Sequence, residues 1–263
     1  MKKLSVLLAL LAFLFTDLVL AASAVATSVT GSAQVQTGAS AGRTLRQGDE
    51  VSQGDTVITG ANSSVVLKFD DGQVAALTSN TRMAITAYQY NPANESGNVL
   101  LSLITGGMRA ITGLIGRRSP SQVAYRAATA TIGIRGTDGT IATDGTNVVV
   151  TVNEGVMTLK MGDLVLTISA GEAVFSRPGA APIRGTISSV LSQLPPAFAA
   201  AIAQSGALSS VIASSNPGTA RQGGDDRGNR GNDGDRGNQG GGTGGGPGGG
   251  GSGGGGGGNA SGR

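Results

Sequence analysis

The chain of 263 residues contains no cysteine, no histidine and no tryptophan. Without cysteine and histidine it cannot form a Ser-His-Asp or Cys-His relay, a thiolate nucleophile, a disulfide or an ordinary zinc site. Carboxylate, lysine and hydroxyl chemistry and oxygen-ligand metals are what remain. Aromatic residues make up 3% of the chain, so the ring platforms that stack sugars or single-stranded nucleic acid are largely missing. We therefore expect a protein that is not an enzyme.

Charged residues are also few, at 13%, whereas 46 residues are glycine, and these are concentrated after Arg221. The foldable part of the chain is therefore much shorter than its length, and we expect one folded domain.

The N-terminus has the composition of an export signal. Lys2 and Lys3 precede an apolar run, and the small-residue motifs ASA (22–24) and AVA (24–26) follow it. Asp17 interrupts the run and leaves it shorter than the roughly 20 residues that span a bilayer. We interpret residues 1–26 as a cleaved signal peptide and expect a periplasmic or secreted mature protein without a transmembrane segment.

From residue 27 to residue 175 the dominant period of the apolar residues is two, and we expect the β domain to span residues 27–180. In SSVVLKF, for example, Val65, Leu67 and Phe69 face one way while Val66 faces the other. Asp-Gly, Glu-Gly and Gly-Asp pairs mark turns at intervals of roughly 8 to 12 residues. The pattern predicts an all-β domain, either a short-stranded β-solenoid or a β-sandwich-like fold.

Two runs resemble the FecR-domain family, an extracytoplasmic module first associated with iron-transport regulators: LLSLITGGMRAITGLIG (100–116) and YRAATATIGIRGTDGTIATDG (125–145). Residues 54–77 and 152–175 resemble the family's flanking strands. The resemblance implies an all-β periplasmic domain that binds other proteins or relays a signal, with no catalytic residues and no cofactor. Regulators of this family would carry a cytoplasmic segment and a transmembrane helix before the domain. Here the signal peptide directly precedes it, so we expect a stand-alone exported FecR-like domain.

The run GIRGTDGT is the most family-like segment. We interpret Gly133, Arg135, Gly136, Thr137 and Asp138 as a structural motif, a strand that ends in a turn. A phosphate cradle is excluded, because the run lacks the lysine of a P-loop and the spacing of a dinucleotide fingerprint. An inward arginine side chain must be paired. We expect a buried tie from Arg135 to one of four carboxylates, those of Asp70, Asp71, Asp138 and Glu154.

Four arginines form a basic stretch across the middle of the domain: Arg109, Arg117, Arg118 and Arg126. They are a candidate interaction face for an acidic partner or a polysaccharide, and the alternative is that they solvate an exposed loop. Asp138, Asp144 and Glu154 have oxygen ligands for Ca²⁺, but their spacing matches neither an EF-hand nor a calcium-binding solenoid, so we expect no metal.

After Pro178 the period becomes helical. The apolar residues Ile187, Val190, Leu191 and Leu194, and then Phe198, Ile202, Leu208, Val211 and Ile212, predict short helices within residues 181–215 that pack on the β domain. The alternative is a partner-binding or membrane-surface helix, against which stands the lack of charge between Arg184 and Arg221.

Residues 216–263 are polar and rich in glycine, and we expect a disordered tail because they cannot bury enough apolar surface to fold. Four arginines before the long glycine run are matched by four aspartates, which leaves no excess of positive charge for nucleic acid. We therefore expect no nucleic-acid partner.

Two functions remain open. The first is a non-catalytic binding or signalling module that docks on an envelope or exported protein. The alternative is a structural component of the cell surface or matrix that assembles through its glycine-rich tail.

Overall fold

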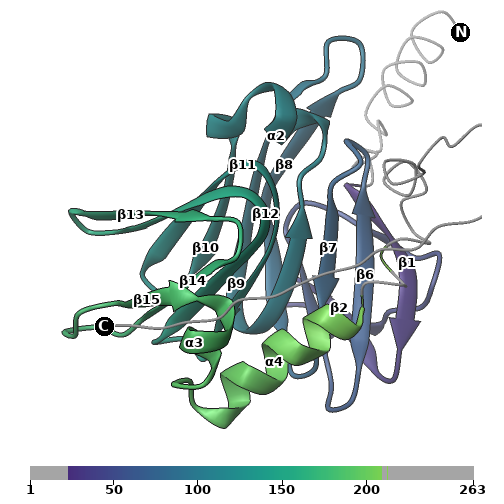
Figure 1. Cartoon of the computed structure of the whole chain (residues 1–263). Coiled ribbons are helices and arrows are strands. Elements are labelled where there is room, and N and C mark those ends of the chain that lie inside the picture. The colour runs from purple at the N-terminus through teal and green to yellow at the C-terminus, as the bar shows by residue number, and fades with distance from the viewer. Residues whose placement is uncertain (1–22, 209–211, 213–263) are drawn as a thin grey trace, which may run out of the picture. The chain divides into compact units, whose positions relative to one another are not determined.

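The computed structural model describes residues 23–208 and Ile212 (Figure 1). The described residues belong to one compact unit. Most of the predicted signal peptide and the whole predicted disordered tail, residues 216–263, lie outside the described residues. Within the described residues, no helix is long and apolar enough to cross a membrane.

The described chain is mostly β-strand, with four short helical elements. The strands of the first half are β1 (Ala24–Thr30), β2 (Ala33–Thr37), β3 (Arg43–Thr44), β4 (Glu50–Val51), β5 (Asp55–Thr59), β6 (Ser64–Phe69), β7 (Val74–Leu77), β8 (Arg82–Asn91) and β9 (Ser96–Ile111). The second half contains α2 (Leu114–Arg118), η1 (Pro120–Gln122), β10 (Val123–Ala127), β11 (Ala130–Thr143), β12 (Val148–Met161), β13 (Leu164–Ser169), β14 (Glu172–Ser176), β15 (Ile183–Thr186), α3 (Ile187–Leu191) and α4 (Pro196–Ala207).

The strands that the structure describes form one open, mixed sheet. β9 and β10 pair in parallel, and α2 and η1 make the crossover between them; the neighbouring pairs β8–β9, β10–β11 and β11–β12 are antiparallel. The order of the strands across the sheet largely follows their order in the chain.

Three long strands bend partway along, and each changes its neighbours at the bend. The first part of β9 pairs with β8 and β10, and its last six residues pair with β7 and β11. β11 and β12 bend together, at the register shift after Arg135. A glycine with positive φ stands at each bend: Gly106 (φ 93°), Gly136 (φ 58°) and Gly155 (φ 75°).

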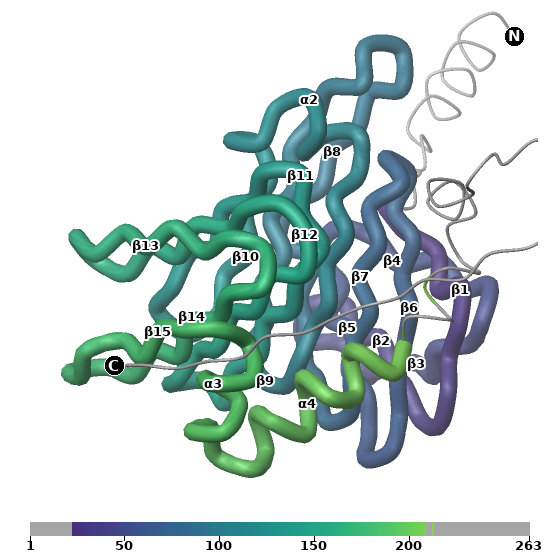
Figure 2. Tube along the Cα trace, in the orientation of Figure 1, coloured from purple at the N-terminus to yellow at the C-terminus, as the bar shows by residue number. Residues whose placement is uncertain are grey.

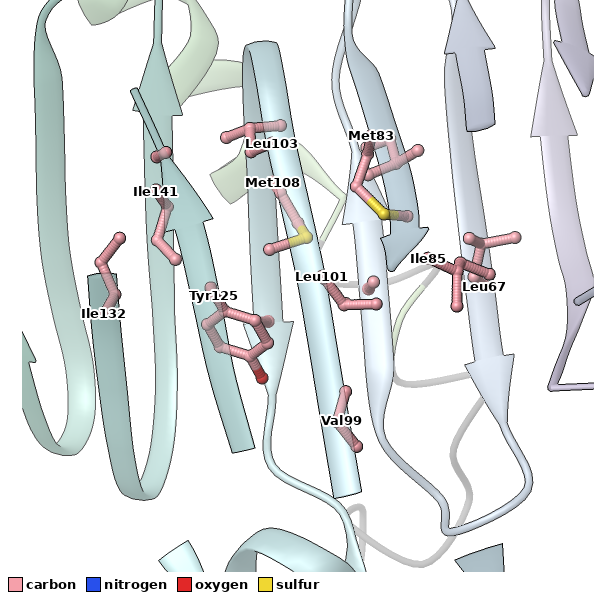
Figure 3. Packing of buried hydrophobic residues seen from close by; sticks show 14 of the residues in the cluster. Leu67, Met83, Ile85, Val99, Leu101, Leu103, Met108, Tyr125, Ile132 and Ile141 are labelled. Atoms are coloured by element: carbon pink, nitrogen blue, oxygen red, sulfur yellow. The ribbon is translucent and has the colours of Figure 1, made fainter. Parts of the chain in front are cut away.

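These bends divide the sheet into two layers that share one hydrophobic core. We call one the open layer: β2, β5, β8, residues 96–105 of β9, β10, residues 130–135 of β11, residues 156–161 of β12, and β13. We call the other the covered layer: β1, β6, β7, residues 106–111 of β9, residues 138–143 of β11, residues 148–154 of β12, β14 and β15. Apolar side chains of both layers form a single buried cluster, in which Leu67 of the covered layer joins Ile85 and Leu101 of the open layer (Figure 3).

The helices after the sheet cover the outer face of the covered layer. Phe198 and Ile202 of α4 pack with Val149 and Phe175, and Leu208 and Ile212 pack with a second apolar group that includes Val66. Figure 1 shows α4 lying across the strands of this layer. Strands β6 and β7 are therefore buried on both faces, whereas strands of the open layer alternate between buried and exposed residues. The prediction that short helices pack on the β domain is confirmed, but residues 183–186 of the predicted helical segment 181–215 form strand β15.

The structure corrects three details of the predicted fold. The strands are not uniformly short, because β9 has 16 residues and β11 and β12 have 14 each. The pairs Asp138-Gly139 and Glu154-Gly155, predicted as turns, lie inside β11 and β12. Gly136 and Gly155, which have positive φ, let the strands bend and continue, so the chain does not reverse there. β1 also begins at Ala24, before the predicted start of the domain at residue 27.

Candidate functional site

The GIRGTDGT run forms the bend of β11. Gly133 and Arg135 stand before the bend, Gly136 is the bend, and Thr137 and Asp138 follow it. Gly155 of β12 lies so close that a Cβ atom added to it would be 2.0 Å from the carbonyl oxygen of Gly136. The run thus brings two backbones together at a corner where side chains have no room.

Hydrogen bonds to Thr112, the residue that follows β9, also fix the corner. The Thr137 amide donates to the hydroxyl of Thr112 (2.8 Å), and the Thr112 amide donates to the Thr137 carbonyl (2.9 Å). Both threonines are buried. The buried amide of Thr137 has no partner strand at the bend, and the Thr112 hydroxyl accepts its hydrogen bond instead.

The expected buried tie at Arg135 is wrong, because the Arg135 side chain is exposed and forms no ion pair with any described residue. The ion pair at this corner is formed by Arg109 instead. Its Nε donates to Oδ1 of Asp138 at 2.7 Å, and its terminal nitrogen donates to Oδ2 at 2.5 Å. The two side chains are 13% and 15% exposed, and this two-pronged bond raises the pKa of Arg109. Asp138 is thus one of the predicted carboxylates, bound by a different arginine.

The structure does not bring the four arginines of the predicted interaction face together. Arg109 is on the covered layer with Asp138, and Arg117 and Arg118 are in α2. Arg118 contacts Glu95 at 3.7 Å. Arg126 lies on β10, and its side chain points out of the open layer because its neighbours Tyr125 and Ala127 are in the core. Only Arg126 joins the surface described next.

The outer face of the open layer carries four exposed cations, which together we call the basic face: Arg82, Arg126, Arg135 and Lys160. None of the four is in an ion pair with a described residue. Among the described outward positions of β8, β10 and β13, and of the open-layer parts of β9, β11 and β12, none is acidic. Four positive charges thus stand on the outer face of the open layer without a carboxylate among the described outward positions of these strand segments.

The register places two of these cations in one row. Arg126 pairs with Thr131, and Thr131 pairs with Lys160, so the two cations are two strands apart. The spacing of strands puts their Cα atoms about 10 Å apart. On the other side of Arg126 the row continues with Ser102 and Ala84. The side chains between the cations are small, which leaves a flat, basic surface.

A buried polar cluster lies where the covered layer meets α2. Both carboxylate oxygens of Asp71 accept bonds, Oδ1 from the Gln73 amide (3.1 Å) and the Tyr88 hydroxyl (3.3 Å) and Oδ2 from the Ile115 amide (3.4 Å). Burial raises the pKa of Asp71, and the three hydrogen bonds partly offset this effect. Tyr125 donates to Gln73 at 3.2 Å. Because these side chains are buried, the cluster holds the crossover in place and offers no surface for a substrate.

Two hollows lie away from the basic face. A groove of about 520 Å³ runs beside α4, and its polar wall residue Gln204 is already bonded, since its Oε1 accepts from the Ser79 amide at 2.9 Å. An open hollow of about 600 Å³ near β4 holds the ion pair of Arg43 and Asp49. Within the described residues, no group of three or more acidic, histidine or cysteine side chains is arranged to hold a metal ion.

Residues 55–158 match the family model described as FecR protein. The matched range begins with β5 and ends in the open-layer part of β12. It includes Arg82, Arg126 and Arg135 of the basic face, and Lys160 lies just beyond it. No curated protein sequence matches the chain.

Two crystal structures of a protein described as "a putative anti-sigma factor from Parabacteroides distasonis ATCC 8503" are similar to the chain. In each case the sequence identity is 14%, the TM-score is 0.41, and the similar part covers 50% of this chain. The chain spans 59% of the length of that protein.

Proposed function

Residues 55–158 form a FecR domain, as the sequence resemblance predicted, and from this premise we propose that the protein is a non-catalytic binding module that docks on an acidic surface of an exported or envelope protein. The observation that carries the proposal is the basic face. Its four cations lack acidic partners among the described residues, and they lie on the layer that none of the described helices covers.

Electrostatics favours a broad acidic partner over a small ligand. The cations are spread along separate strands, and none of them lines the hollows described for this part of the chain. An acidic protein surface could approach several of them at once, which accelerates association and orients the partner. The outward positions of the described open-layer strands carry no aromatic ring, so the stacking platform typical of sugar binding is missing and a protein partner is favoured over a polysaccharide.

The environment of the carboxylates supports a non-catalytic role. Asp138 is bound by Arg109, and Asp71 is buried among hydrogen-bond donors. The basic face itself offers cations and hydroxyls with no general base beside them. We infer binding without chemistry, in the periplasm or outside the cell, where the export signal predicted for residues 1–26 would send the domain.

Site-specific photo-crosslinking in the native host tests the proposal. A photoreactive residue at Thr131, which stands between Arg126 and Lys160, should capture a discrete protein partner from the envelope or the medium. The same residue at Ser188, exposed on α3, should not capture it. The yield at position 131 should fall as salt rises, because exposed charges are screened.

Charge reversal supplies the matched control. The double variant Arg126→Glu/Lys160→Glu should lose the cross-linked partner, whereas Arg46→Glu/Arg117→Glu, with the same change in net charge at exposed sites elsewhere, should retain it. All four positions are exposed, so both variants should melt close to the wild type. Equal loss in both variants, or the same partner captured from position 188, would refute docking through the basic face.

A further inference from the structure

β13 is an edge strand with an unusual composition. Among the described strands it pairs only with β12, at one end of the sheet (Figure 2). Its sequence, LVLTIS, contains no charged residue and no proline. Leu164 is 39% exposed and Val165 is 57% exposed, and these are two of the four large apolar side chains that stand exposed in the described chain. Proteins usually protect such an edge with charge, proline, bulges or shortness.

The other ends of the two layers have this protection. β3 and β4 are two residues long and contain Arg43 and Glu50 respectively. β15 follows Pro182, is four residues long, and holds its arginine in an ion pair with Glu172 of β14. β13 is six residues long and has none of these features. Its exposure is therefore an exception within this sheet, which points to pairing with another strand.

The register shows which backbone groups of β13 are available. Met161 and Leu164 close the two-residue turn of the β12–β13 hairpin, so their backbone groups bond to each other. Because pairs alternate along an antiparallel ladder, the amide and carbonyl groups of Val165 and Thr167 point away from β12. The next outward amide, that of Ser169, already donates to Glu172 at 2.8 Å. Apart from the carbonyl of Ser169 at the end of the strand, the free edge thus consists of two residues with four backbone groups.

We propose that β13 pairs antiparallel with β13 of a second copy of this chain, about a two-fold axis at Leu166. In this register Val165 faces Thr167 of the other copy and Thr167 faces its Val165. All four outward backbone groups of each copy are then satisfied. Leu166 stands opposite its own counterpart, and Leu164 stands opposite Ile168 of the other copy, on the side of the strand that faces the core. A shift by one residue would place outward backbone groups opposite inward ones.

The side chains suit a second copy of the same strand. β13 is uncharged, so pairing it with itself places no like charges opposite one another. The two exposed apolar residues, Leu164 and Val165, both gain neighbours. Lys160 is one strand in from the edge. Three strand spacings and a two-residue offset separate it from its counterpart by about 16 Å, beyond the screening length of about 8 Å.

The arrangement has a functional consequence that rests on the proposed function. The two-fold axis is perpendicular to the sheet, so the open layers of both copies join into one sheet with both basic faces on the same side. A partner with two acidic sites, or two partners in an array, would meet eight cations in place of four, which gains affinity by avidity. The contact between copies is a single strand pair, and small interfaces of this kind form weak, reversible dimers.

A single engineered cysteine tests the pairing directly, because the natural chain has none. Leu166 and its counterpart occupy a non-hydrogen-bonded pair, with Cα atoms about 4.5 Å apart, which is within the range that a disulfide bridges. The Leu166→Cys variant of the full chain should form a disulfide-linked dimer under mild oxidation, in proportion to protein concentration. Thr158→Cys, exposed on the neighbouring strand β12, should stay monomeric under the same conditions.

Sedimentation of the wild type, which has no cysteine, measures dimerisation independently of any disulfide. The wild type should show concentration-dependent dimerisation, which Thr167→Pro should weaken at least tenfold, since proline removes an outward donor and leaves the bonds to β12 intact. Thr158→Lys should dimerise as the wild type does. A wild type that is monomeric at all concentrations, or a dimer that Thr167→Pro leaves unchanged, would overturn the proposal. Cross-linking of Leu166→Cys only to other proteins would show that a different strand occupies this edge.

Discussion

Removing the side chain of Arg109 should destabilise the fold far more than removing that of Arg135. Arg109→Ala leaves the carboxylate of Asp138 at 15% exposure without its two-pronged partner. Loss of one member of a fully buried pair costs about 3 to 5 kcal/mol. Since water reaches this pair partly, we expect a cost of about 2 to 3 kcal/mol. Arg135 is exposed and forms no ion pair with a described residue, so Arg135→Ala should change the free energy of unfolding by less than about 0.5 kcal/mol.

Urea denaturation and differential scanning calorimetry of the two variants measure this contrast. For a domain of this size the loss at Arg109 corresponds to a fall in Tm of about 5 to 10 °C. The double variant Arg109→Ala/Asp138→Ala should cost at least about 1 kcal/mol less than the sum of the two single variants, because each single change already removes the shared interaction. Additive single variants, or an Arg135→Ala variant as unstable as Arg109→Ala, would refute the assignment of the tie to Arg109.

Three other outcomes follow from the structure. Burial raises the pKa of Asp71 above 3.8, so the folded state holds this proton more tightly than the unfolded state. The free energy of unfolding should therefore fall as pH rises from 3.8 to the raised value, and urea titrations across pH should show a flatter curve for Asp71→Asn. Gly155→Ala should cost more than about 3 kcal/mol, because φ is 75° and the new methyl group meets backbone, whereas Gly171→Ala, with open space around it, should cost about 1 kcal/mol in the same denaturation assay. Phe198→Ala should cost about 3 kcal/mol in thermal unfolding, since this ring is buried and packs edge-on against another phenylalanine, at 5.6 Å between centroids.

The period-two pattern predicted the strands well because it reports burial against a core directly. Val65 and Leu67 face the shared core, as the alternation predicted. The pattern predicted one buried face, yet Val66 is buried too, beneath residues at the C-terminal end of α4. That second burial depends on a helix more than 130 positions away in the chain, so no local period contains it.

For the site, too, the local pattern predicts which way a side chain points but not which residue it pairs with. Ile132 and Ile134 are in the core, so alternation alone puts Arg135 on the outside, and the expectation of an inward arginine set this local signal aside. Arg109 also points away from the core, as its neighbours Met108 and Ala110 require. Its pairing with Asp138 depends on β9 and β11 lying side by side, which is a property of the sheet order and not of either segment. The basic face was missed because its four cations come from four different strands.

The order of the strands has a consequence for how the chain folds. No two described strands pair across more than 45 positions, the separation of Ala24 and Phe69. Strand pairing is therefore confined to a moving window of the sequence, as in repeat proteins. Each pair of strands can form as soon as its window is available, and the growing sheet then serves as the template for the next strand. A chain that enters a compartment from its N-terminus can thus begin to fold before its last strands have arrived.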